Sequence, residues 1–250
     1  MKQEVNGCEL PRAMLIDMDD TILTLTETST RCWGDLCVTY APRLSAVDVQ
    51  ELAALLHISR AEYWRDPERH RSGRLDLMGS RRAILSHFLT QIGTLDVELT
   101  ESLAEEMAHY FTETYFSTLT AFPGAIEAVR ELRARGVKLA LITNGEGREQ
   151  RRKIEQFELA PLFDCVIVEG EFGKGKPDLE VYHHALTTLA VEPHEAWMVG
   201  DNLEWEVFVP KQLGLYTVWV DFAKKGLPAT VPVQPDRIIH NLAELVAPFP

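Results

Sequence analysis

The sequence predicts an α/β protein: a doubly wound, Rossmann-like parallel sheet with helices on both faces, interrupted by an inserted α-helical segment. Short apolar runs of the kind that form buried parallel strands recur along the chain. Helical patterns lie between these runs, and such alternation is typical of a parallel sheet. The stretch 27–118 differs, because it holds helical patterns and no convincing buried strand. We therefore expect an α/β core formed by 1–26 and 119–250, with a small helical domain at 27–118.

The predicted strands are short, and most end beside polar residues or glycine. In chain order they are Ala13–Ile16, Val137–Ile142, Cys165–Val168, Trp197–Val199 and Thr217–Val220, with a last short element at Arg237–Ile239. A helix is predicted at Ala125–Arg135, directly after Pro123 and Gly124. A second is predicted after Asp178, which can cap its first turn. Its apolar residues recur at helical spacing: Leu179, Tyr182, Leu186 and Leu189.

The inserted segment is rich in arginine and contains no lysine. Its arginines crowd the middle of the segment: Arg60, Arg65, Arg69, Arg71, Arg74, Arg81 and Arg82. One interpretation is that some of them bind an anionic part of a substrate. The alternative is that most are solvated and pair with acids nearby in the sequence, such as Asp66, Glu68 and Asp76. Trp33 and Trp64 are interpreted as core residues of this segment rather than as stacking platforms.

Composition limits the partners of the chain. The formal net charge of −13 opposes binding to nucleic acid. No run approaches the ~20 apolar residues of a membrane helix, and the N-terminus lacks the pattern of a signal peptide. The four cysteines form no C-x-x-C pair. We therefore expect a cytoplasmic protein that binds neither membrane nor nucleic acid. A local cation cluster or a bound divalent metal would still allow a small phosphorylated molecule to bind.

Polar residues follow four of the predicted strands, in the third case after a longer loop. In a doubly wound sheet, ligands bind beyond the carboxyl ends of the strands. The segments at that edge are Asp17–Thr21, Thr143–Gly145, Gly173–Asp178 and Gly200–Asn202. Acids, a hydroxyl group and a lysine are therefore expected to converge there.

Asp17 and Asp19 suggest phosphoryl-transfer chemistry. Two carboxylates at i and i+2 on a continuing strand point the same way and repel one another. A divalent metal removes that repulsion, and oxygen ligands without cysteine or histidine suit magnesium. Asp17 can attack phosphorus and form an aspartyl-phosphate. Asp19 can protonate the leaving oxygen and later activate water.

The remaining polar residues at this edge suit a phosphate. Lys176 can hold the nucleophile and balance the charge of the phosphoryl group. The Thr143 hydroxyl and the amides near Asn144 and Gly145 can bind phosphoryl oxygens at a helix N-terminus. Each of these short motifs taken alone is more often an ordinary turn or a helix cap. Their joint occurrence at successive strand ends favours a site.

The motifs together resemble the haloacid dehalogenase superfamily of hydrolases. The resemblance rests on DMDDT at Asp17–Thr21, LITNG at Leu141–Gly145, GKGKPD at Gly173–Asp178 and VGDNLEWE at Val199–Glu206. It covers essentially the whole predicted core. The segment at 27–118 is similar to the helical cap domain that this superfamily inserts between its first two motifs.

The resemblance implies a role for five residues. Asp17 would be the nucleophile and a magnesium ligand. Asp19 would be the general acid and base, and would bind the metal through its backbone carbonyl. Thr143 would hold a phosphoryl oxygen, Lys176 would orient the nucleophile, and Asp201 would be the third protein ligand of the metal.

The last motif departs from the superfamily at one position. The second aspartate that is usual there is replaced by Glu206, whose side chain is one methylene longer. Glu206 could still hold a metal-bound water, and the alternative is a solvated helix glutamate. Asn202 is expected near the metal as well, or as a cap of the following helix. The departure bears on metal preference rather than on the type of reaction.

The predicted reaction is magnesium-dependent hydrolysis of a small-molecule phosphate monoester through an aspartyl-phosphate. Asp19 argues against a dehalogenase, because a halide needs no acid and dehalogenases of the superfamily lack an aspartate at this place. The absence of lysine from 27–118 argues against a phosphonate hydrolase, which needs an imine-forming lysine there. A phosphomutase stays open, and so does a non-catalytic metal-binding regulatory module.

Overall fold

The computed structural model describes residues 4–5, 8–44, 48–93 and 97–246, with side chains from residue 10 onward. The chain divides into two compact units, which are described separately. One unit consists of Met1–Thr24 together with Thr120–Pro250, and the other of Leu25–Leu119.

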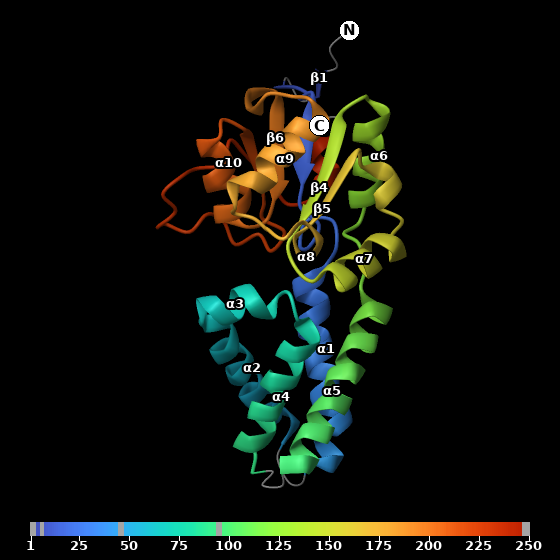
Figure 1. Ribbon diagram of the computed structural model, residues 1–250, viewed down its shortest axis with the longest axis vertical. Coiled ribbons are helices and arrows are strands. Elements are labelled where there is room, and N and C mark those ends of the chain that lie inside the picture. The colour runs from blue at the N-terminus through green and yellow to red at the C-terminus, as the bar shows by residue number, and fades with distance from the viewer. Residues whose placement is uncertain (1–3, 6–7, 45–47, 94–96, 247–250) are drawn as a thin grey trace. The chain divides into compact units, whose positions relative to one another are not determined.

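The first unit is built on a six-stranded sheet in which every neighbouring pair of strands is parallel (Figure 1). The order across the sheet is β5-β4-β3-β6-β7-β8. The strands are β3 (Ala13–Ile16), β4 (Lys138–Thr143), β5 (Cys165–Val168), β6 (Ala196–Gly200), β7 (Tyr216–Val220) and β8 (Arg237–Ile239). The chain winds outward from β3 to β5, returns to the other side of β3 at β6, and continues to β8. The predicted doubly wound sheet is confirmed.

Both faces of the central strands are buried, which explains why they are continuous apolar runs. On β3, Ala13 and Leu15 belong to a core cluster that includes residues of helix α9 (Leu179–Leu189). Met14 and Ile16 alternate with them on the other face and are also fully buried.

Helices cover the sheet and connect its strands (Figure 1). Asp178 caps α9 as predicted, because its side chain accepts a hydrogen bond from the Glu180 amide at 3.0 Å. The other helices are α6 (Ala125–Ala134), α7 (Gly147–Gln156), α8 (Glu169–Phe172) and α10 (Val209–Gln212). Shorter turns are η2 (Ala160–Leu162), η3 (Pro193–Glu195), η5 (Leu242–Leu245) and the π-helix η4 (Leu203–Phe208). A small antiparallel pair, β1 (Glu4–Val5) and β2 (Cys8–Glu9), precedes the sheet.

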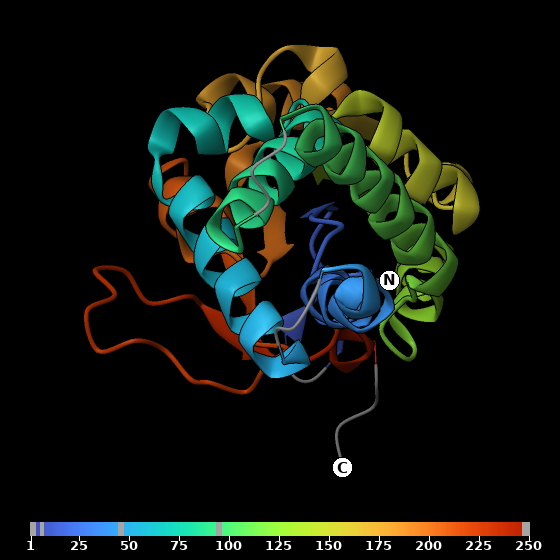
Figure 2. The ribbon, with the colours of Figure 1, turned by 90° about the horizontal axis from the view of Figure 1, so that it is seen from below.

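The second unit contains helices only within its described residues. They are α1 (Leu25–Tyr40), η1 (Ala41–Arg43), α2 (Val49–Arg65), α3 (Pro67–Gly73), α4 (Leu77–Gln91) and α5 (Val97–Thr118). Helices α1, α2, α4 and α5 pack in a ring, which Figure 2 shows with α1 nearly end-on and the other three helices at a slant. Trp33 lies in the core of this unit and stacks on Phe111 with ring centroids 4.0 Å apart. Trp64 is half-buried and contacts Tyr63 edge-on.

Within the described residues, no helix combines the length and the apolar character that crossing a membrane requires.

Candidate active site

Strand register places three of the predicted motifs at one edge of the sheet. Ile16, the last residue of β3, pairs with Leu141 on one side and with Val199 on the other. The Asp17 amide continues this register by donating to the Val199 carbonyl at 2.9 Å. Because the strands are parallel, Asp17, the end of β4 and the end of β6 lie at the same level.

Asp17 and Lys176 form a buried ion pair across this edge. Lys176 Nζ lies 2.5 Å from Asp17 Oδ1, and the Lys176 side chain is 1% exposed. The Thr21 hydroxyl donates to the other oxygen, Oδ2, at 3.3 Å. The Asn144 side chain fixes the lysine's backbone: it accepts from the Lys176 amide at 2.8 Å and donates to the Lys176 carbonyl at 2.7 Å. The structure thus places Lys176 in direct contact with Asp17, the residue predicted to be the nucleophile.

Glu206 is buried beside the same lysine. Its side chain is fully buried, and its Oε1 lies 2.7 Å from Lys176 Nζ. Its Oε2 accepts from the Asn202 amide at 2.8 Å. The alternative of a solvated helix glutamate is thus wrong. Glycine at 200 is required by this packing, because a Cβ there would lie 2.2 Å from Glu206 Cγ and 3.0 Å from Asp17 Cβ.

The backbone on either side of Glu206 is held by hydrogen bonds. The Asn202 side chain caps η4, accepting from the amides of Glu204 at 3.0 Å and Trp205 at 3.1 Å. Asn202 therefore caps the following helix, which was one of the two roles expected for it. The Tyr182 hydroxyl donates to the Trp205 carbonyl at 2.6 Å. Before the turn, the Trp219 indole donates to the Asp201 carbonyl at 2.7 Å.

If all the carboxylates at this edge were ionised, they would carry more negative charge than Lys176 can balance, and their pKa values are raised accordingly. Burial raises the pKa of Asp17. Burial, together with the charges of Asp17 and Glu206, raises the pKa of Asp201 to about 9. Burial also raises the pKa of Glu206 to about 7, although Lys176 opposes that change. Burial alone would lower the pKa of Lys176, but the charges of Asp17 and Glu206 raise it on balance. The site would be stabilised by an additional cation.

The donor set of the predicted magnesium site is compatible with that charge. The described residues contain no group of three or more His, Cys, Asp or Glu that could hold a metal ion. The predicted set needs only two carboxylates, Asp17 and Asp201, and adds the backbone carbonyl of Asp19. These are hard oxygen donors of the kind that magnesium prefers. The excess of acid around Lys176 and this donor chemistry therefore fit a divalent cation.

Asp19 is held by two residues of α7 that the sequence did not reveal. Lys153 Nζ lies 2.9 Å from both Asp19 Oδ1 and Oδ2. Gln150 Nε2 donates to Asp19 Oδ2 at 2.9 Å. Both partners are almost fully buried, at 2% and 1% exposure. Ile154 is the one apolar residue in α7 (GREQRRKIEQ), so its buried face had to include polar side chains, and this was the available signal.

The predicted phosphate-binding residues Thr143, Asn144 and Gly145 make hydrogen bonds to other residues of the protein. The Thr143 hydroxyl lies at the end of β4 and accepts from Gln150 Nε2 at 2.5 Å. The Gly145 amide donates to Glu169 Oε2 at 2.9 Å. The Asn144 side chain is engaged with the backbone of Lys176, as described above. In this structure Asn144 and Gly145 thus hold neighbouring loops together.

The arginines of the second unit lie mainly against aromatic rings and acids. Arg60 lies 4.9 Å from the Trp33 ring centroid, and burial lowers its pKa to about 10. Arg81 is buried and donates to the Thr112 hydroxyl at 2.9 Å. Arg82 pairs with Glu105 at 2.9 Å, which matches the expectation that such residues pair with acids. This acid lies in a different helix, not nearby in the sequence as expected.

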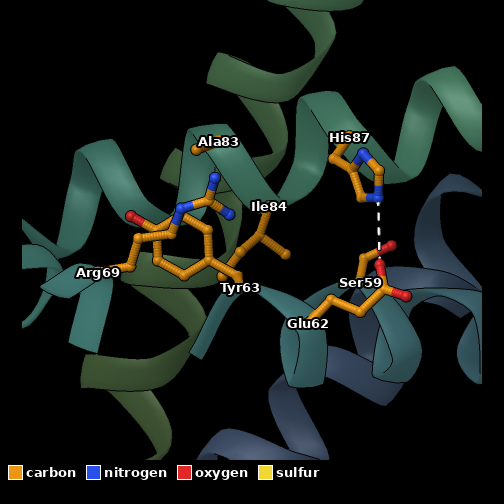
Figure 3. A pocket seen from close by; sticks show the side chains of 7 residues that line it. All are labelled: Ser59, Glu62, Tyr63, Arg69, Ala83, Ile84 and His87. Carbon is orange, nitrogen blue, oxygen red and sulfur yellow. Dashed lines mark ion pairs between the residues drawn. The ribbon is translucent and has the colours of Figure 1, made fainter. Parts of the chain in front are cut away.

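A pocket of about 490 Å³ lies within this unit and is lined from α2, α3 and α4 (Figure 3). The His87 Nε2 and Glu62 Oε2 atoms lie 3.4 Å apart at one end, and each side chain is about half exposed. Arg69 lies over the Tyr63 ring at the other end, 5.7 Å from its centroid. Charges of both signs line the pocket, so its composition selects neither anions nor cations.

Comparison with known proteins gives a consistent picture. The family model of haloacid dehalogenase-like hydrolases matches residues 11–214. A phosphoserine phosphatase from Thermus thermophilus is 38% identical over 146 residues, which is 57% of each chain. An N-acylneuraminate-9-phosphatase from Rattus norvegicus is 34% identical over 146 residues, or 58% of each chain. The chain thus matches just over half the length of these two curated relatives. A 2-haloacid dehalogenase from Pseudomonas syringae has a solved structure that matches with 25% identity and a TM-score of 0.62, covering 95% of this chain and 97% of that one.

Proposed function

This chain belongs to the haloacid dehalogenase-like hydrolase family, and from that membership we propose that it is a phosphatase acting on a small-molecule phosphate monoester. The observation that carries the proposal is the buried contact between Asp17 and Lys176 at the carboxyl edge of the sheet. The two curated relatives described above are named as phosphatases, which supports it.

In the first proposed step, a carboxylate oxygen of Asp17 attacks the phosphorus atom of the substrate. A bond forms between that oxygen and phosphorus, and the bond from phosphorus to the leaving oxygen breaks. Asp19 gives its proton to the leaving oxygen, so an alcohol departs. Lys176 holds Asp17 in place and balances part of the charge on the phosphoryl group, and Thr143 binds a phosphoryl oxygen.

In the second step, water attacks the aspartyl-phosphate. Asp19 accepts a proton from that water, the new bond joins the water oxygen to phosphorus, and the bond to Asp17 breaks. Inorganic phosphate leaves, and both aspartates return to their starting protonation states. Asn144 and Gly145 stay predictions as phosphate ligands, because their side-chain and amide contacts are with the protein.

Magnesium is proposed as the cofactor, held by the Asp17 and Asp201 carboxylates and the Asp19 carbonyl. When bound, it neutralises charge on the phosphoryl group and favours in-line attack. The acid excess around Lys176 supports this proposal. Glu206 and Asn202 stay predictions as residues near the metal. Glu206 has an additional role in the structure, because it pairs with Lys176.

The second unit is proposed to act as the cap that selects the substrate, as expected for 27–118. A cytoplasmic location, and the absence of nucleic-acid and membrane partners, also stay predictions; the net charge of −13 supports the absence of a nucleic-acid partner.

A panel assay tests the proposal and separates it from its alternatives. Phosphate release is measured from phosphorylated metabolites and one aryl phosphate, with magnesium and with a chelator, alongside Asp17→Asn. A phosphatase releases phosphate only with magnesium, and the variant is inactive although its circular dichroism is unchanged. Turnover that moves phosphate within the substrate would indicate a mutase, and halide release from a 2-haloacid would indicate a dehalogenase. A folded, magnesium-binding protein that is silent on every substrate would support the regulatory module.

A further inference from the structure

Lys153 and Gln150 bring a buried ammonium and a buried amide to one carboxylate. Moving an ammonium out of water costs several kcal/mol unless a partner compensates. Lys153 is 2% exposed and contacts both oxygens of Asp19 at 2.9 Å, whereas the Asp19 side chain is 20% exposed. Asp19 is therefore held from the protein side and remains accessible on its other side.

The donors are distributed unequally between the two oxygens of Asp19. Oδ2 accepts hydrogen bonds from both Lys153 and Gln150, whereas Oδ1 accepts one from Lys153 only, among the described residues. Each carboxylate oxygen has about two acceptor positions. Among the described residues, the contacts therefore fill both positions on Oδ2 and one on Oδ1. The oxygen with a position left for a proton in transfer is Oδ1.

Gln150 also connects Asp19 to the end of β4. Its Nε2 lies 2.5 Å from the Thr143 hydroxyl and 2.9 Å from the Asn144 carbonyl, besides its contact with Asp19. Its two N–H groups are shared among three acceptors. The orientation of Asp19 is thus fixed relative to Thr143, the residue proposed to bind the phosphoryl group.

From these contacts we propose that Lys153 and Gln150 are positioning residues, which hold Asp19 so that its Oδ1 exchanges the proton with the leaving group and later with water. The inference rests on the proposed phosphatase function and extends it to two residues outside the predicted motifs. A structural role alone would not need an ammonium here, because an apolar residue beside Ile154 would fill the same face of α7.

The leaving-group dependence of kcat/KM tests the inference. Alkyl phosphates need a proton on the departing oxygen, whereas aryl phosphates with acidic phenols need much less help. We expect Lys153→Met and Gln150→Met each to lower kcat/KM for alkyl phosphates about ten- to a hundredfold more than for an acidic aryl phosphate. Arg148→Gln is the matched control, since it changes an exposed residue of the same helix. It should leave both classes of substrate unchanged.

A double-variant comparison shows whether these residues act through Asp19. In the Asp19→Asn background, Lys153→Met should change kcat/KM for the aryl phosphate by less than about twofold, because the group it positions is already disabled. Far-UV circular dichroism checks that each variant is folded, and Gln150→Met provides the test if Lys153→Met does not fold.

Three results would overturn the inference, and they can be distinguished from one another. Equal losses for alkyl and aryl phosphates, or full additivity with Asp19→Asn, would mean that the two residues only stabilise the fold. A wild-type protein that releases phosphate from neither class would overturn the proposed function, and this inference with it.

Discussion

Replacing Glu206 by glutamine removes one negative charge from the buried cluster around Lys176 and keeps the length of the side chain. In the metal-free protein this cluster holds Asp17, Glu206 and Asp201 against a single lysine. Lys176 keeps its contact with Asp17 after the change, so no buried ammonium is left alone. We therefore expect the substitution to stabilise the metal-free protein at alkaline pH.

The magnitude follows from the pKa of Glu206. Burial raises this pKa from an ordinary 4.5 to about 7, because the opposing effect of Lys176 is smaller. A pKa that is higher in the folded state contributes stability that is fully present below about pH 4.5 and is lost as pH rises through about 7. At 1.36 kcal/mol per pKa unit, the loss reaches about 3 kcal/mol at pH 8. Glutamine does not ionise, so its variant escapes this loss.

The assay is urea unfolding followed by circular dichroism, with a chelator, at pH 5 and at pH 8. Glu206→Gln should be more stable than wild type by up to about 3 kcal/mol at pH 8 and by less than about 1 kcal/mol at pH 5. Glu204→Gln, at an exposed position of the same element, should change stability at neither pH. A Glu206→Gln protein less stable than wild type at pH 8 would show instead that the ion pair of Glu206 with Lys176 outweighs the repulsion among the carboxylates.

Three further substitutions follow from contacts in the two units. Tyr182→Phe leaves the Trp205 carbonyl without its hydroxyl donor and should lower the free energy of unfolding by about 1 kcal/mol in urea titrations, whereas no change would mean that water replaces the hydroxyl. Gly200→Ala forces a Cβ against Glu206, and should cost about 1–3 kcal/mol and impair turnover; normal kcat would contradict this. Trp33→Ala removes a buried stacked ring and should lower the free energy of unfolding by about 3–5 kcal/mol in urea titrations. A decrease below about 1 kcal/mol would mean that the ring contributes little to the core of this unit.

The sheet and the loops at its edge could be predicted because their signals are local. Each core strand is a short apolar run, and three of the motifs lie where a run ends, so the parallel register brings those three together. The fourth motif, Gly173–Asp178, is separated from β5 by α8. Asp17 and Lys176 are 159 residues apart in sequence. Their contact could still be expected, because an acid and a lysine that follow strands of one parallel sheet lie at the same edge. The pair β1 and β2 has two residues per strand, which is too short for any periodic pattern.

Side chains whose role depends on tertiary burial could not be predicted in the same way. Gln150 and Lys153 look like solvated residues of a polar helix, and only their burial against Asp19 distinguishes them. The motif that contains Glu206 predicted that this residue lies near the site. Its contact with Lys176 could not be predicted, because it depends on the π-helix that begins after Asn202.

A carboxylate oxygen of Asp17 is proposed to accept the phosphoryl group, so the aspartyl-phosphate should be trapped on this residue. The protein is mixed with substrate and magnesium, quenched in acid, and treated with borohydride, which reduces an aspartyl-phosphate to homoserine. Peptide mass spectrometry then locates the modified position. We expect homoserine at position 17, dependent on substrate and absent in Asp17→Asn. A phosphoryl group found on another residue during turnover, with position 17 unmodified, would contradict it.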